Sequence, residues 1–473
     1  MSESDFPLEP NEIEAIIKKY SNLNRGLADS FLDSEQFELL VQHFEEEENY
    51  KKALQCANDG LEQYPGHSGL LLDKANVLLL LHQYQKALDI LDQIPEEKEI
   101  NSNLILLRTE GLLALDRVDE ANEILKNAFL LTHDDETVEM FFELADVYDS
   151  FELFNNVFDC MAQILVLEPT NEEALYKIGF WTDYNGRYEE SIEIHQKIIE
   201  DFPYSELAWF NLGLAYQGLK LHEKAIDAYE YCLAIDDSME FAHRNIGDAY
   251  LRLRKYDLAI EYLSKLLEFT TPESIIYEAI GHCYDKKKKF VQARRFYKKA
   301  SHLHPEDSSI IYKIAQTYMS ELKWKTAINL LLVATKMTKM QTDYHNALGQ
   351  CYAELEDYSE AITHLGIVIR TKPRNKSAWI ALLNCLFMET DYNDGLDYAK
   401  LASTQTDNKP IFDFYQFLFL FMLGSINESI LILEQAMRVS PKLIKQIVEL
   451  HPSILQHKQI LEVIARYKKI RNR

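Results

Sequence analysis

The same residue types return every 34 residues along most of this chain of 473 residues. The segments NLGLAYQ, NIGDAYL, AIGHCYD and NALGQCYAE all belong to this repeat. A period of about 34 residues is the length of one helix-turn-helix unit. A hairpin of this size cannot bury its apolar face alone, so it must pack against its neighbours. The repeat therefore predicts one continuous stack of helical hairpins, and not the roughly three globular domains that a prior of about 150 residues per domain suggests.

When Glu206 is taken as position 1 of a unit, small side chains recur at two positions. Position 8 is Gly or Ala in eight units: Ala75, Ala145, Gly179, Gly213, Gly247, Gly281, Ala315 and Gly349. Position 20 is Ala, Gly or Ser in eleven units: Ala53, Ala87, Ala121, Ser191, Ala225, Ala259, Ala293, Ala327, Ala361, Gly395 and Ser429. We expect these two positions to face each other, so that the two helices of a hairpin pack closely.

Two further positions carry large or rigid residues. Position 11 is aromatic in seven units and is expected to fill the space beside the close approach: Phe44, Tyr148, Tyr216, Tyr250, Tyr284, Tyr318 and Tyr352. Position 32 holds six of the twelve prolines, which end the second helix: Pro65, Pro169, Pro203, Pro305, Pro373 and Pro441. Trp209 and Trp379 both stand at position 4.

This combination of small, aromatic and proline positions resembles the tetratricopeptide repeat. The resemblance covers residues 34–443 as twelve units that start at 34, 68, 102, 138, 172, 206, 240, 274, 308, 342, 376 and 410. It implies an all-α fold, a right-handed α-solenoid of helix-turn-helix repeats, in which the first helix of each unit lines a concave inner surface.

Two non-repeating ends flank the array. Residues 1–33 contain an amphipathic helix whose apolar face is formed by Ile13, Ile16, Ile17 and Tyr20. Residues 444–473 show a similar pattern in LIKQIVEL and QILEVIARYKKI, and this end is basic. Because a solenoid needs caps with a polar outer face, we expect N-terminal and C-terminal capping helices here.

The charge of the chain restricts its partners. Lys and Arg number 49 against 76 Asp and Glu, a net charge of −27, which disfavours nucleic acid and anionic membranes and favours a basic protein or peptide. The first ten residues lack the basic and apolar regions of a signal peptide, and the six cysteines form no CxxC pair, so we expect a cytoplasmic protein. The apolar segment at residues 411–424 is too short to cross about 30 Å of hydrocarbon.

No motif of a nucleotide site, a metalloprotease, a serine hydrolase or a calcium loop occurs in the chain. We therefore predict a protein that is not an enzyme, with no cofactor, metal or small-molecule substrate. His302 and His304 form the one close histidine pair, and without nearby ligands they are interpreted as polar residues at a helix end.

The resemblance implies that positions 2, 5, 9 and 12 of the first helices face a ligand groove. In the units that start at 138 to 308, these positions combine aromatic, acidic and amide side chains, which suit a partner segment of basic character. The candidate groove residues are Phe142, Asp146, Tyr176, Phe180, Asp183, Phe210, Gln217, Arg244, Asp248, Glu278, His282, Asp285, Tyr312 and Gln316.

The same positions are apolar near both ends of the array: Leu72, Leu79, Leu106 and Leu113 in the second and third units, and Ile380, Phe387, Phe414, Leu418 and Phe421 in the last two. Exposing them to water would be costly, so either the terminal helices cover them or the C-terminal end forms a homodimer. A second alternative function is nucleic-acid or ribosome binding through residues 442–473, which carry eight Lys and Arg against two Glu.

Overall fold

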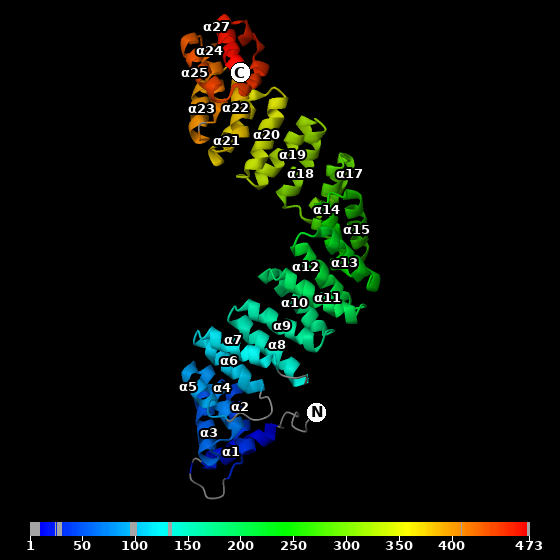
Figure 1. Ribbon diagram of the computed structural model, residues 1–473, viewed down its shortest axis with the longest axis vertical. Helices are drawn as coiled ribbons and strands as arrows, with labels where there is room; N and C mark the ends of the chain where they lie inside the picture. Colours follow the sequence, from blue (N-terminus) through cyan, green and yellow to red (C-terminus); the bar gives the residue numbers. More distant parts are fainter. Residues whose placement is uncertain are drawn as a thin grey trace. The chain divides into compact units, whose positions relative to one another are not determined.

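The structure is a computed structural model that describes residues 10–23, 25, 31–94, 102–130, 135–407 and 409–470. These residues form 27 α-helices and two short 3-10 helices, and no strand occurs among them (Figure 1). The predicted all-α repeat array is confirmed.

Most of the helices form twelve hairpins in chain order. The first helices are α2 (Ser34–Glu46), α4 (Ser68–Leu80), α6 (Ser102–Ala114), α8 (Asp135–Ser150), α10 (Glu172–Asn185), α12 (Glu206–Gly218), α14 (Glu240–Arg252), α16 (Ser274–Lys286), α18 (Ser308–Ser320), α20 (Thr342–Glu354), α22 (Lys376–Met388) and α24 (Pro410–Met422). The second helices are α3 (Tyr50–Gln63), α5 (Tyr84–Leu91), α7 (Val118–Ala128), α9 (Phe154–Leu167), α11 (Tyr188–Asp201), α13 (His222–Ile235), α15 (Tyr256–Phe269), α17 (Phe290–Leu303), α19 (Trp324–Met337), α21 (Tyr358–Thr371), α23 (Tyr392–Gln405) and α25 (Ile426–Val439).

The chain divides into two compact parts, residues 1–245 and residues 246–473. Within each part, neighbouring hairpins pack against each other, for example α10 against α12 and α20 against α22 (Figure 1). The array continues through both parts with the same hairpin, so we propose that the twelve predicted units are its building blocks. One first helix departs from the predicted unit start, because α8 begins at Asp135 and not at 138.

The turn inside each hairpin has a common backbone conformation. One residue of each turn adopts a left-handed conformation, with φ between 56° and 81°: Glu48, His82, Asp116, Glu152, Gly186, Lys220, Arg254, Lys288, Leu322, Glu356, Thr390 and Gly424. Only two of these twelve are glycine, although glycine alone adopts this conformation without a steric cost. The packing of the two flanking helices therefore imposes the turn in most hairpins.

The close contact inside the hairpins differs from the one we predicted. A Cβ atom added to Gly213 would lie 2.5 Å from the ring of Tyr229, and one added to Gly281 would lie 2.7 Å from the ring of Tyr297. The small residue at position 8 therefore makes room for the large residue at position 24 of the same hairpin. It does not chiefly face position 20, because a large side chain on the second helix fills that space.

The aromatic residue at position 11 connects neighbouring hairpins. Tyr148 is fully buried, and its hydroxyl donates a hydrogen bond to the carbonyl oxygen of Ala121 at 3.1 Å. Ala121 occupies position 20 of the preceding hairpin. A small side chain at position 20 thus leaves the backbone of one hairpin accessible to the ring of the next.

Both ends of the chain pack on the array. In α1 (Pro10–Leu23), Ile16 and Tyr20 are buried in the same cluster as Phe37 of α2. At the other end, the chain forms a 3-10 helix (Pro441–Leu443), α26 (Ile444–Leu450), a second 3-10 helix (Pro452–Gln456) and α27 (Lys458–Ile470). The apolar residues of this end are buried together with the last hairpins. Their predicted role as caps of a solenoid stays a prediction.

Candidate functional site

The predicted groove residues all lie on first helices, but they belong to different parts of the chain. The part formed by residues 1–245 contains Phe142, Asp146, Tyr176, Phe180, Asp183, Phe210, Gln217 and Arg244. The part formed by residues 246–473 contains Asp248, Glu278, His282, Asp285, Tyr312 and Gln316.

A pocket of about 360 Å³ brings the first of these residues together. It lies between α8, α9 and α10 and is lined by Ala145, Asp146, Asp149, Val157, Met161, Tyr176, Lys177, Phe180 and Trp181. Its lining combines two carboxylates of α8, Asp146 and Asp149, with aromatic side chains of α10. The 34-residue step explains this pairing, because Asp146 and Phe180 occupy the same position of successive hairpins.

The aromatic side of the pocket is exposed to solvent. Tyr176, Phe180 and Tyr184 keep 77%, 62% and 59% of their surface accessible. Large apolar side chains that gather on one surface of a protein mark interaction sites. Exposure at this level therefore makes α10 the strongest candidate for a contact with another molecule in this part of the chain.

These rings are held in position by one another. Phe154 of α9 stacks on Trp181 with centroids 5.3 Å apart, and it meets the edge of Tyr184 at 4.8 Å. Phe180 meets the edge of Trp181 at 4.8 Å and lies 6.1 Å from Tyr184. An aromatic surface that is ordered before binding loses little conformational freedom when a ligand arrives.

Helix α10 is itself well anchored. The side chain of Asn171 accepts a hydrogen bond from the backbone N–H of Ala174 at the start of the helix, at 3.0 Å. Asn185, at its end, donates to the carbonyl oxygen of Phe154 at 2.9 Å. In its first turn, the carbonyl oxygen of Leu175 accepts a 2.6 Å hydrogen bond from the side chain of the buried Asn211 of α12. The exposed rings therefore stand on a helix that is tied to both neighbouring hairpins.

The acidic side of the pocket has uncompensated charge. Asp146 and Asp149 are exposed and form no ion pair or side-chain hydrogen bond with any described residue. Asp183 of α10 accepts a hydrogen bond from the hydroxyl of Tyr188 at 2.8 Å. Lys177 is the one cation that lines the pocket, and it pairs with Glu173 at 2.7 Å. The result is a local negative field beside aromatic faces. Below, "acidic-aromatic surface" means Asp146, Asp149, Tyr176, Phe180, Trp181 and Tyr184.

Other predicted residues of this part contribute less exposed surface. Phe142 is half-buried, and the Lys177 ammonium lies 5.1 Å from its ring centroid. Phe210 is half-buried against Tyr229, and Gln217 accepts a hydrogen bond from the Tyr229 hydroxyl at 3.2 Å. Arg244 is also half-buried.

The sequence analysis missed Trp181, Tyr184 and Phe241. Phe241, at position 2 of its unit, is 63% exposed and lies 6.5 Å from Phe210. The spacing of Phe180 and Tyr184 by four residues is a signal that could have found Tyr184, because such residues share one face of a helix.

The predicted residues between 246 and 473 have compensated charges. The Asp248 carboxylate lies 3.4 Å from the Arg252 guanidinium, and Glu278 pairs with Lys313. Asp285 is half-buried, and this burial raises its pKa. Tyr312 packs on Tyr344 with centroids 4.9 Å apart, and His282 and Gln316 are exposed. These residues lie together on neighbouring helices without forming an acidic surface.

The two parts of the chain differ in the sign of their charge. Residues 1–245 contain 17 Lys and Arg against 51 Asp and Glu, a net charge of −34. Residues 246–473 contain 32 Lys and Arg against 25 Asp and Glu, a net charge of +7. The total of −27 is the sum of these two values, so the net charge of the whole chain hid the difference. An acidic groove is thus supported only within the first part.

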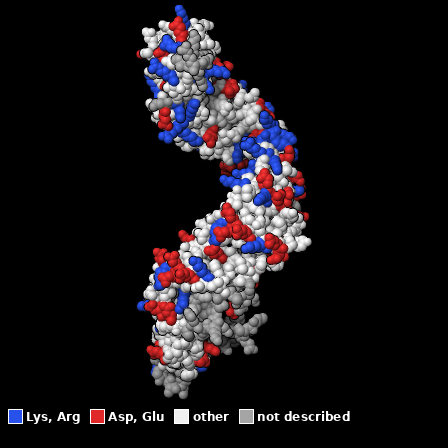
Figure 2. All heavy atoms as spheres, viewed as in Figure 1, with Lys and Arg blue, Asp and Glu red and all other residues white. Residues whose placement is uncertain are grey.

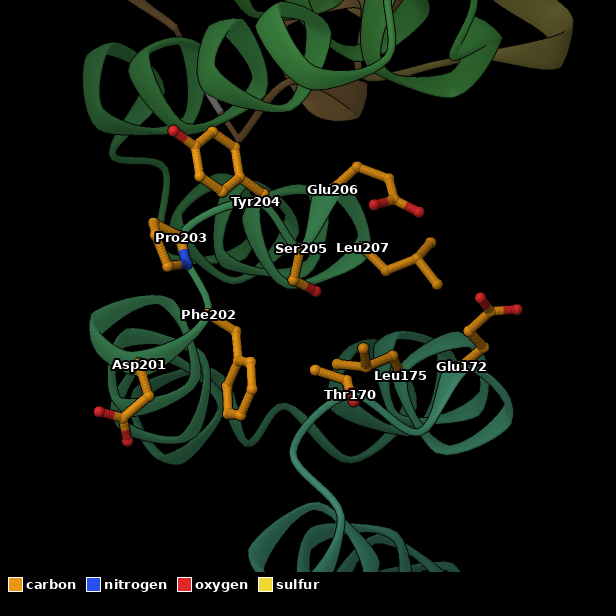
Figure 3. A pocket seen from close by; sticks show the side chains of 10 residues that line it. All are labelled: Thr170, Glu172, Leu175, Asp201, Phe202, Pro203, Tyr204, Ser205, Glu206 and Leu207. Carbon is orange, nitrogen blue, oxygen red and sulfur yellow. The ribbon is translucent and has the colours of Figure 1, made fainter.

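A second pocket, of about 390 Å³, lies where α11 ends and α12 begins (Figure 3). Thr170, Glu172 and Leu175 line one side of it, and the segment from Asp201 to Leu207 lines the other. The Trp209 indole N–H donates to the carbonyl oxygen of Pro203 at 2.9 Å, which holds this segment in place. None of the predicted groove residues lines this pocket.

The cysteines are not placed for thiol chemistry, because all six are buried with free thiols. Burial raises the pKa of Cys56, Cys232, Cys283 and Cys351 to about 12, which leaves these thiols protonated at neutral pH. Among the described residues, no group of three or more His, Cys, Asp or Glu side chains is placed to hold a metal ion. In that same part of the chain, every helix is too short or too polar to span a bilayer.

Comparisons with known proteins agree with the repeat. A model of the tetratricopeptide repeat matches residues 45–110, and a model of the tetratricopeptide repeat protein 21 C-terminal ARM domain matches residues 215–350. No curated protein matches the chain.

Solved structures match at low identity. YrrB, described as a tetratricopeptide repeat protein with an unusual peptide-binding site, is 20% identical over 40% of this chain and 96% of its own, with a TM-score of 0.35. Cut9–Hcn1 of the APC/C is 14% identical over 87% of this chain and 97% of its own, with a TM-score of 0.36. The C-terminal part of a repeat protein from Cytophaga hutchinsonii is 16% identical over 54% of this chain and 99% of its own, with a TM-score of 0.45. Similarity at this level carries no information about the partner of this chain.

The repeat signature in the sequence, the hairpin array in the structure and the matches to two family models agree with one another. The chain is a tetratricopeptide repeat protein.

Proposed function

We propose that this protein is a non-enzymatic scaffold that binds a basic segment of a partner protein on the acidic-aromatic surface of α8–α10. One observation carries the proposal: two carboxylates without partners, Asp146 and Asp149, line the same pocket as the exposed rings of Tyr176 and Phe180. Guanidinium and ammonium groups pair with carboxylates and stack on aromatic faces. An arginine or lysine side chain therefore fits both sides of the pocket at once.

The surface also suits a protein better than a small molecule. The exposed rings of Tyr176, Phe180 and Tyr184 extend along α10 over more than two helical turns. Aromatic side chains are the most frequent energetic anchors of protein interfaces. A segment with a basic residue for the pocket and apolar residues for the neighbouring rings would use the whole surface. We place the protein in the cytoplasm, and the six free thiols support a reducing compartment.

The homodimer alternative has lost its main basis. It required the apolar residues of the last units to face solvent, but Phe414 and Leu418 are fully buried in one cluster with Ile447 and Ile460 of the C-terminal end. Burial of these residues within the chain favours the scaffold proposal over the homodimer.

The nucleic-acid alternative is also weaker. Arg466 of α27 pairs with Glu434 at 2.9 Å, and Arg438 donates a hydrogen bond to the Tyr467 hydroxyl at 3.0 Å. Part of the basic C-terminal end thus lies against an acidic residue of the array. Lys468, Lys469, Arg471 and Arg473 belong to this end as well, and their side chains lie outside the described residues.

Binding of a basic peptide tests the proposal. We expect a labelled ten-residue peptide of alternating arginine and leucine to bind the full chain, as measured by fluorescence anisotropy. In the variant D146K/D149K, attraction at two sites becomes repulsion, so the affinity should fall by roughly tenfold or more. In the separate variant F180A/Y184A, two apolar anchors are lost, and we expect its affinity to be about tenfold or more below that of the wild type.

The matched control reverses two other exposed carboxylates of the same part of the chain. E189K/E193K makes the same change of charge on α11, away from the pocket, and its affinity should stay within about twofold of the wild type. An equal loss in all three variants would mean that the peptide responds to the net charge of the chain. Unchanged binding in both D146K/D149K and F180A/Y184A would refute the site.

A further inference from the structure

The hairpin of α16 and α17 carries the highest density of positive charge in the described residues. Residues 286–299, KKKKFVQARRFYKK, contain eight Lys and Arg and no Asp or Glu. The following second helix, α19, has no acidic residue either. Figure 2 shows Lys and Arg gathered over α17. We name the exposed side chains of this hairpin the basic strip: Lys286, Lys288, Lys289, Arg295, Lys298 and Lys299.

The backbone places these side chains on one surface. Lys288 is the left-handed residue of the turn, with φ 57°, and Lys289 precedes the first residue of α17. Arg295, Lys298 and Lys299 are spaced by three and four residues, so they share the exposed face of the helix. The strip therefore runs from the turn along α17.

Two other cations of this hairpin have structural roles. Lys287 pairs with Asp257 of α15, and the buried Arg294 pairs with Glu321 at 3.1 Å and donates a hydrogen bond to Thr317. By contrast, the side chains of Lys286, Lys288, Lys289, Arg295 and Lys298 form no ion pair or hydrogen bond with any described residue. Lys299 lies over the rings of Tyr277 and Phe296, at 5.0 and 5.2 Å from their centroids. Most of the charge of the strip is thus available to a ligand.

We propose that the basic strip binds an acidic segment of a partner protein. This site is separate from the acidic-aromatic surface, opposite to it in charge, and its existence does not depend on that surface. With one acidic and one basic surface, the scaffold would bind a basic protein and an acidic protein at separate sites and so connect them.

A protein segment fits the strip better than a nucleic acid does. Sequence-tolerant binding of single strands relies on exposed aromatic rings that stack on bases. Here Tyr297 is buried, and Phe296 already stacks on Tyr284 with centroids 5.4 Å apart. The strip thus offers charge without a stacking surface, which matches carboxylates on a flexible chain.

The test measures binding of a labelled ten-residue glutamate peptide to the full chain by fluorescence anisotropy at about 0.05 M and 0.2 M salt. We expect binding at low salt that weakens at high salt. The variant K288E/K289E/R295E/K298E should lose roughly tenfold or more in affinity, since it replaces four attractive charges with repulsive ones.

Two controls make the result specific. K336E/K339E/R374E/K376E reverses four other exposed cations of the same part of the chain, and it should bind the glutamate peptide within about twofold of the wild type. F180A/Y184A should also bind it normally, so failure of the proposed function and failure of this inference are distinguishable. Circular dichroism should show the same helix content in all variants, since every substituted residue is exposed.

Three results would overturn the inference. The first is an absence of binding at low salt, or equal binding by the strip variant and the wild type. The second is a tighter complex with a single-stranded RNA decamer than with the glutamate peptide, which would make the strip a nucleic-acid surface. The third is concentration-dependent self-association of the wild type that the strip variant lacks, which would make a second copy of the chain the occupant.

Discussion

A chain that ends at Ser440 is expected to lose most of the stability of its C-terminal hairpins and to self-associate. The deleted end contributes six buried aliphatic side chains to the cluster around the last hairpins: Ile444, Ile447, Ile454, Ile460, Val463 and Ile464. At about 1.5–3 kcal/mol for each buried side chain, the loss is on the order of 10 kcal/mol. The deletion would also expose Phe387 and Phe421, whose rings lie 5.5 Å from His451 and 5.7 Å from His457.

Urea unfolding followed by circular dichroism and sedimentation velocity checks this prediction. The shortened chain should begin to unfold at a lower urea concentration than the full chain, and it should sediment partly as oligomers. A control chain that ends at Tyr467 keeps the buried residues and should behave as the full chain does. If the chain ending at Ser440 stays monomeric and unfolds as the full chain does, the C-terminal end does not cover the array. If the full chain is a dimer and the shortened one a monomer, the homodimer alternative gains support.

Two alanine substitutions at helical glycines are expected to change stability in opposite directions. In Gly281→Ala, the new Cβ would lie 2.7 Å from the buried ring of Tyr297, so the hairpin must open or shift, at a cost of about 2 kcal/mol. In Gly366→Ala, on α21, the nearest atom is 3.9 Å away, so only the higher helix propensity of alanine remains. That variant should gain about 0.5–1 kcal/mol.

A second substitution should rescue the first. Three units with Ala at position 8 carry Leu or Met at position 24, namely Ala75 with Leu91, Ala145 with Met161 and Ala315 with Leu331. Gly281→Ala combined with Tyr297→Leu recreates the Ala315–Leu331 pair, so it should recover part of the loss. Free energies of unfolding from urea titrations measure all three variants. A loss in Gly366→Ala as large as that in Gly281→Ala would show that glycine at position 8 is not required by this contact.

The fold was predictable from the sequence because each hairpin repeats the same solution of a packing problem. The 34-residue period, the small residues and the helix-ending prolines predicted the helical array, because each of them depends on the local geometry of one hairpin. The pairing of position 8 with position 24 was not predictable from size alone. Two small residues suggest a mutual contact, whereas in the structure Gly213 accommodates the ring of Tyr229.

The candidate site was predictable only in part. The family positions gave Asp146, Tyr176 and Phe180, which the structure brings together in one pocket. Trp181 and Tyr184 lie outside those positions, and in the structure Phe154 of the neighbouring helix packs against both rings. The sequence also could not show that residues 1–245 and 246–473 form separate parts. Without that boundary, the opposite net charges of the two parts add up to one acidic total.

Hydrogen exchange is the most direct test of the proposed partner site. Amide exchange of the full chain, measured with and without a saturating amount of the arginine-leucine peptide, locates the contact along the sequence. We expect slower exchange in α8, α9 and α10 and no change in α16 and α17, because the peptide stabilises only the helices that it touches. Protection confined to residues 246–473, or no protection at saturation, would contradict binding at the acidic-aromatic surface.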